Sequence, residues 1–195
     1  ISLEMRENLI MQFASFESDK TGTQVQKLLP ELKHQLQQFG LERVWKPPIK
    51  SSDRERQLTI AWLSGDIGYH PVSRFLLGFF SSYRSPIHRH ILIDTNDQLQ
   101  ESNRNLFESL PHISVFNLGT SWWPDMVPLV RKLEPDIAID LSGWTGGHFA
   151  RGFLARIAEL QVNYLGYFGS TGLPNMDYWV GDYQLFPKNT VEWHS

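Results

Sequence analysis

The segment 64–74 combines a histidine, an acid and two glycines in front of a proline. His70 precedes Pro71, and proline favours the first position of a helix, whose N-terminus can hold an anion. Histidine can accept a proton near neutral pH, and Asp66 lies four residues before it. The dinucleotide-binding spacing G-x-G-x-x-G is missing. The pattern indicates a proton-transfer site or, alternatively, a histidine that only caps the helix.

A second glycine-rich segment, 141–148, follows a predicted strand and contains Ser142 and Thr145. Its amides and hydroxyls could bind phosphate or sugar oxygens, or the glycines could serve only a tight turn. Asp136 and Asp140 lie four residues apart on the preceding strand, and therefore on one face of it. Both could be polar ends of the strand, or one could be an acid of the site.

A third segment, 166–174, combines aromatic side chains, which could stack on a sugar or a base, with small residues that allow close approach. His88 and His90 could both lie on one side of a strand, as metal ligands do. Because no third ligand has a suitable spacing, we interpret these two histidines as surface residues.

Apolar strands and helices alternate along the chain after residue 55, and short strands in this order predict an α/β fold. The fold is a mostly parallel, doubly wound, Rossmann-like sheet with helices on both faces. Its functional loops lie at the carboxyl ends of the strands. We predict strands at 58–63, 90–94, 113–116, 136–141, 162–166 and 178–181, and helices at 71–83, 97–109, 122–133 and 150–158.

The first part of the chain differs from this pattern. Apolar residues recur every three or four positions over 25–39, which predicts an amphipathic helix ending near Gly40. Two prolines and a polar run make 46–54 a linker. We therefore divide the chain into a helical segment with its linker, 1–54, and a Rossmann-like lobe, 55–195.

Composition excludes several classes of protein. The 195 residues contain 18 Lys and Arg against 21 Asp and Glu, a net charge of -3, which argues against nucleic-acid binding through positive charge. No cysteine is present, so disulfides and thiolate metal sites are excluded. The longest dense apolar run, 75–80, is too short to span a membrane, and no signal-peptide pattern begins the sequence. We expect a cytoplasmic protein without membrane contact.

Four motifs, in order within 58–182, resemble the O-GlcNAc transferase family, also called SPINDLY-like or family 41 glycosyltransferases. The family pattern S-x-D-x-x-x-H-P-x-S matches SGDIGYHPVS at 64–73, and N-G-Y-T-x-G is similar to SGWTGG at 142–147. The pattern L-G-Y-P-G-T-S-G resembles LGYFGSTG at 165–172, and M-D-Y-x-x-x-D matches MDYWVGD at 176–182.

The resemblance implies an inverting, metal-independent enzyme of the two-lobed GT-B type. Its donor is UDP-GlcNAc or another UDP-sugar, and its acceptor is a serine or threonine of a protein or peptide. Residues 55–195 would be a truncated amino-terminal catalytic lobe, and 1–54 would connect it to tetratricopeptide repeats. A missing carboxyl-terminal lobe would supply most contacts to UDP, so we expect the fragment alone to be inactive. The alternatives are a bacterial-type glucosyltransferase acting on asparagine and a non-catalytic acceptor-binding or assembly module.

The resemblance also suggests roles for single residues. His70 matches a family histidine proposed as catalytic base, and Asp136 occupies the position of another family histidine. Thr145 and Gly169 match positions that line the donor sugar pocket, while Phe168 replaces a family proline. We predict that His70 and Asp136 are catalytic and that no residue binds a metal. The predicted donor- or acceptor-binding residues are Asp66, Ser142, Gly143, Thr145, Gly166, Tyr167, Gly169 and Thr171.

Overall fold

The computed structural model describes the chain from residue 18 to residue 184 with gaps, and residue 6. The described ranges are 18–42, 45–46, 56–83, 87–96, 101–119, 121–167 and 169–184. Most of the predicted linker 46–54, the proposed boundary near residue 55 and Phe168 lie outside these ranges. The division of the chain into two parts therefore stays a prediction.

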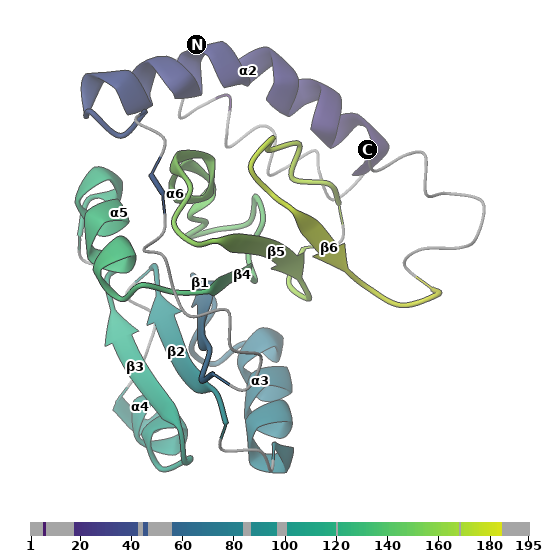
Figure 1. Cartoon of the computed structure of the whole chain (residues 1–195). Helices are drawn as coiled ribbons and strands as arrows, with labels where there is room; N and C mark the ends of the chain where they lie inside the picture. The colour runs from purple at the N-terminus through teal and green to yellow at the C-terminus, as the bar shows by residue number, and fades with distance from the viewer. Residues whose placement is uncertain are drawn as a thin grey trace.

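One six-stranded sheet forms the centre of the molecule, in the order β3-β2-β1-β4-β5-β6 (Figure 1). Every neighbouring pair is parallel. This confirms the predicted Rossmann-like α/β fold, in which the strand order reverses between β1 and β4. The strands are β1 Thr59–Ser64, β2 Arg89–Asp94, β3 Ile113–Asn117, β4 Ile137–Asp140, β5 Leu160–Tyr164 and β6 Tyr178–Val180.

Helices cover both faces of the sheet (Figure 1). One face packs against α2, α5 and α6, and the other against α3 and α4. Among the described residues, no helix is both long and apolar enough to cross a membrane. The helices are α2 Ser18–Gln38, α3 Pro71–Ser82, α4 Glu101–Glu108, α5 Trp123–Lys132 and α6 Ala150–Ala155.

Strand β1 shows why the sheet needs both layers. Ala61 and Leu63 pack into the core below α2, α5 and α6, whereas Trp62, between them, packs into the core beside α3. Side chains alternate between the two faces of a strand, so a strand buried on both sides is apolar throughout. The predicted amphipathic helix is also confirmed, because α2 buries Val25, Leu28, Leu29, Leu32 and Leu36.

Strand β5 begins and ends two residues earlier than predicted. Gln161 lies within the strand although it is polar, because both ends of its buried side-chain amide make hydrogen bonds. Its Oε1 accepts from Ile157 N–H at 2.9 Å, and its Nε2 donates to the carbonyl oxygen of Phe153 at 2.9 Å. Leu165 has a φ of 70°, a left-handed conformation that ends the strand.

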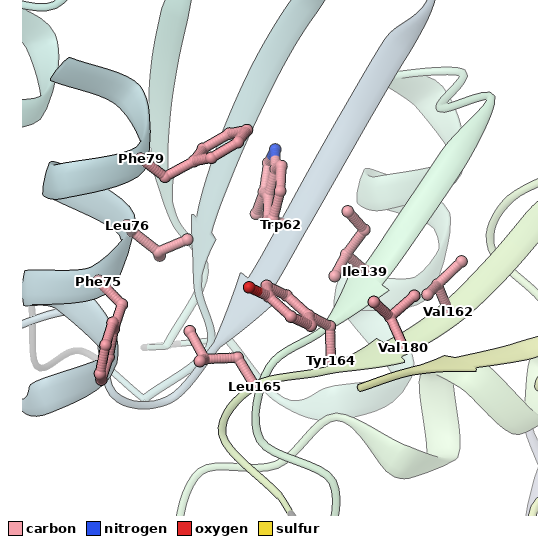
Figure 2. A pocket seen from close by; sticks show the side chains of 9 residues that line it. All are labelled: Trp62, Phe75, Leu76, Phe79, Ile139, Val162, Tyr164, Leu165 and Val180. Carbon is pink, nitrogen blue, oxygen red and sulfur yellow. The ribbon is translucent and has the colours of Figure 1, made fainter. Parts of the chain in front are cut away.

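An apolar cavity of about 440 Å³ opens on the α3 side of the sheet. Figure 2 shows that its walls come from α3, β1, β4, β5 and β6. Three of its residues remain substantially exposed, Phe75 at 63%, Val180 at 48% and Phe79 at 45%. The lining residues are Trp62, Phe75, Leu76, Phe79, Ile139, Val162, Tyr164, Leu165 and Val180.

Candidate functional site

The predicted loops meet where the strand order reverses. Strands β1 and β4 are neighbours, and they end at Ser64 and Asp140. The loops 65–70 and 141–148 begin at these two ends. In open parallel sheets this position forms a crevice at the carboxyl edge, where ligands bind.

Hydrogen bonds join the two loops directly. The Ser142 hydroxyl oxygen accepts from Gly65 N–H at 3.1 Å and lies 3.3 Å from the Ser64 hydroxyl. The Ser64 hydroxyl oxygen also accepts from Asp66 N–H at 3.0 Å. A Cβ atom on Gly65 would lie 2.6 Å from the Gly146 carbonyl oxygen, so a glycine is required for the loops to touch. The structure thus brings Ser142 and Asp66 into one cluster.

Thr95 adds a third chain segment that the sequence analysis did not single out. Its N–H donates to the Ser64 carbonyl at 2.9 Å, and its hydroxyl donates to the Gly147 carbonyl at 2.6 Å. Its position directly after β2, at the same edge of the sheet as Ser64, could have identified Thr95 from the sequence. Thr145 closes its own turn by donating from its hydroxyl to the Ser142 carbonyl at 2.7 Å.

Asp140 anchors the start of the loop after β4 through hydrogen bonds. One carboxylate oxygen accepts from the N–H groups of Ser142 and Gly143, both at 3.0 Å. The other lies 3.5 Å from the amide nitrogen of Asn163, which donates to it. Burial raises the pKa of Asp140 and outweighs these hydrogen bonds, which act to lower it. Asp140 therefore acts as a buried acceptor that fixes the start of the loop.

Asp136 lies at the opposite, amino-terminal edge of the sheet, just before β4. Its carboxylate accepts from the Arg56 guanidinium at 2.8 Å and from Thr59 N–H at 2.7 Å. These are the contacts of a polar strand end. The structure does not bring Asp136, predicted to be catalytic, together with His70, because the length of β4 separates this carboxylate from the loops at the carboxyl edge.

His70 caps α3 and still faces solvent. Its Nδ1 accepts from Val72 N–H at 3.4 Å, which confirms the capping interpretation, while 46% of the side chain is exposed. The same Nδ1 lies 3.9 Å from a carboxylate oxygen of Asp66. Burial raises the pKa of Asp66, and the neighbouring His70 acts in the opposite direction. The cap and the acid thus hold an accessible imidazole beside the loop cluster.

The loop after β5 supports the site from within the protein. Tyr167 and Thr171 are buried, at 3% and 6% exposure. The Thr171 carbonyl accepts from the Trp144 indole N–H at 2.8 Å. Gly143 has a φ of 54°, and a Cβ atom on it would lie 2.3 Å from the Tyr167 ring, so the ring packs directly against the glycine backbone. The predicted stacking surface at Tyr167 is therefore corrected, because this ring packs under the loop after β4.

The cavity of Figure 2 is separate from this cluster, since none of the predicted site residues lines it. Gly166 and Gly169 lie on the loop that supports the cluster; Gly169 is buried and Gly166 is half-buried. The structure thus gathers Asp66, His70, Ser142, Gly143 and Thr145 at the carboxyl edge.

Comparisons with known proteins identify relatives in plants. A SPINDLY protein of Petunia hybrida, named as a probable UDP-N-acetylglucosamine–peptide N-acetylglucosaminyltransferase, is 28% identical over 151 residues, which cover 74% of this chain and 16% of the relative. The SEC protein of Arabidopsis thaliana, named as the same kind of enzyme, is 27% identical over 154 residues, covering 76% of this chain and 16% of the relative. The chain thus spans about a sixth of these relatives.

A solved structure shares the fold. An O-GlcNAc transferase mutant from Thermobaculum terrenum superposes with a TM-score of 0.75 and 24% identity. The match covers 96% of this chain and 35% of that one. No protein-family model matches the sequence. Together with the plant relatives, this fold confirms the resemblance found in the motifs.

Proposed function

We propose that this chain, a homologue of the SPINDLY and SEC proteins, is the amino-terminal lobe of an inverting glycosyltransferase that moves a sugar from a UDP donor to a protein hydroxyl. One observation carries the proposal: an exposed imidazole stands beside the hydrogen-bonded loops after β1 and β4, at the carboxyl edge of the sheet. The relatives named as N-acetylglucosaminyltransferases favour N-acetylglucosamine as the sugar.

In the proposed reaction, the acceptor oxygen attacks the anomeric carbon and its proton passes to His70. The bond from that carbon to the UDP oxygen breaks, and UDP leaves from the opposite face of the sugar. Asp66 is placed to orient the imidazole during transfer, since its carboxylate lies 3.9 Å from Nδ1. When Nδ1 carries the proton and directs it toward Asp66, His70 gives up the hydrogen bond that Nδ1 accepts from Val72 N–H, and Nε2 is free to accept the acceptor proton.

The loop after β4 is the proposed donor side. The resemblance places Thr145 at the sugar, and the structure holds Thr145 in a turn anchored to Ser142. Positive groups of a second lobe would stabilise the charge on the leaving diphosphate, so the proposed transfer needs no metal.

The test uses the longest protein that carries this lobe, with several UDP-sugars, with serine, threonine and asparagine peptides, and with EDTA present. His70→Asn is the informative variant, because asparagine is a good helix cap but a poor proton acceptor. We expect kcat to fall about 10²- to 10⁴-fold while the thermal stability stays close to that of the unsubstituted protein.

His70→Ala, which also removes the cap, should lose the same activity and in addition about 1 kcal/mol of stability. Transfer by His70→Asn at the original rate would refute the base. Transfer to asparagine peptides alone would instead support the N-glucosyltransferase alternative, and absence of transfer to every peptide would favour a binding module.

A further inference from the structure

Tyr69 is a highly exposed aromatic residue next to His70 of the candidate site. Its side chain is 86% exposed, and it directly precedes His70. Large rings are usually buried at least in part, because each buries a large apolar area when it packs. An exposed ring directly beside an accessible imidazole can stack on a ligand bound at that imidazole.

Arg74 holds this ring in place. The carbon of its guanidinium lies 5.2 Å from the centre of the Tyr69 ring, within the range of a cation–π interaction. Arg74 is fixed one helical turn after the loop, since its N–H donates to the His70 carbonyl at 3.3 Å. The guanidinium covers one face of the ring, and the exposure of Tyr69 leaves the other face open to solvent.

The geometry points to a stacking platform, made of Tyr69 and Arg74, that selects acceptor segments with a ring side chain next to the modified residue. Tyrosine, phenylalanine or proline of the acceptor would stack on the open face of Tyr69 while the neighbouring hydroxyl reaches His70. This inference rests on the proposed function, because it assumes that a polypeptide binds at His70.

The spacing fits adjacent residues of an extended acceptor. Tyr69 and His70 are consecutive, so their Cα atoms are about 3.8 Å apart. An extended chain advances about 3.3 Å per residue, so the stacked ring would lie one or two positions from the modified residue. The proposed donor residues lie elsewhere, on the loops after β4 and β5, whereas Tyr69 leads into α3. Because Tyr69 lies on a different loop from the proposed donor residues, we assign the platform to the acceptor.

Peptide binding to the 195-residue chain tests the platform without any donor. The probes are two fluorescent peptides with one central serine, flanked on both sides by tyrosine in the first and by alanine in the second. Fluorescence anisotropy should show that the tyrosine peptide binds about fivefold to tenfold more tightly. Tyr69→Ala should make the two affinities equal, and Tyr69→Phe should keep the difference.

Tyr178→Ala is the matched control, because Tyr178 is 63% exposed on β6, the outermost strand of the sheet, which β4 and β5 separate from β1. It should leave the preference unchanged. A preference that survives Tyr69→Ala, or the lack of any preference in the unsubstituted chain, would overturn the platform. His70→Asn separates the two proposals, because it should stop sugar transfer and leave the peptide preference intact.

Discussion

Two aspartates on one strand show how the two edges of this sheet differ. Asp136 lies just before β4 and Asp140 is its last residue, so the two carboxylates lie at opposite edges of the sheet. At the amino-terminal edge the carboxylate pairs with Arg56 and one backbone N–H. At the carboxyl edge it is fully buried and receives two consecutive N–H groups of a loop. Asp136 therefore binds groups at the start of the strand, whereas Asp140 fixes a loop of the candidate site.

Two histidines near these edges also differ. His90, in the first half of β2, is 2% exposed, and its Nδ1 accepts from the Trp62 indole N–H at 3.1 Å. His70, beyond the end of β1, keeps nearly half of its side chain in solvent. His90 is thus engaged in packing near the amino-terminal edge, whereas His70 remains accessible beyond the carboxyl edge.

The largest expected effect is at Asp140. Asp140→Ala leaves the N–H groups of Ser142 and Gly143 buried without their acceptor, which we expect to destabilise the fold by about 4 kcal/mol in urea unfolding. Asp140→Asn keeps an oxygen for both N–H groups and should lose only about 1 kcal/mol. Equal losses in the two variants would contradict the acceptor role and would assign the effect to the charge.

Sequence patterns predicted the fold well because apolar strands and amphipathic helices are local signals. The five stripe residues of α2 and the alternating faces of β1 follow from spacing alone. The gathering of Asp66 and Ser142 followed from a general rule about parallel sheets, without any knowledge of their contacts.

Long-range contacts explain what the sequence could not predict. The interpretation of His90 as a surface residue is wrong. Trp62 on the neighbouring strand donates a hydrogen bond to it, and the rings of Phe80 and Tyr83 enclose it, with ring centres 5.2 and 4.9 Å away. Tyr167 is buried for a similar reason, since its ring packs against Gly143 only because that residue has no Cβ atom, which would lie 2.3 Å from the ring. Neither contact has a signature in local spacing.

The second effect in size is a loss of stability in acid that originates at the amino-terminal edge. Burial lowers the pKa of His90 to about 4, and the neighbouring His88 and His112 act in the same direction. The folded protein therefore binds fewer protons than the unfolded chain between pH 4 and 6.5. The stabilisation is complete above pH 6.5 and is lost as the pH falls toward 4, by on the order of 2 to 3 kcal/mol.

Urea unfolding at pH 7 and at pH 4.5 measures this loss. His90→Phe should reduce the difference between the two pH values, although removal of the acceptor for Trp62 lowers stability at both. The exposed His34 gives the control His34→Phe, which should keep the full difference. Some dependence on pH remains in every variant, because burial also lowers the pKa of His148 to about 4. An unchanged difference in His90→Phe would assign the acid sensitivity to other groups.

The smallest expected effect is at Asp136, and it decides whether the two edges have separate tasks. Asp136→Ala leaves the Thr59 N–H without its carboxylate acceptor, which should lower stability by about 2 kcal/mol. Sugar transfer at a temperature where the variant is folded should stay within about twofold of the original rate, because a strand separates this carboxylate from His70. A loss approaching that of His70→Asn, in a variant that still folds, would mean that the amino-terminal edge also takes part in the reaction.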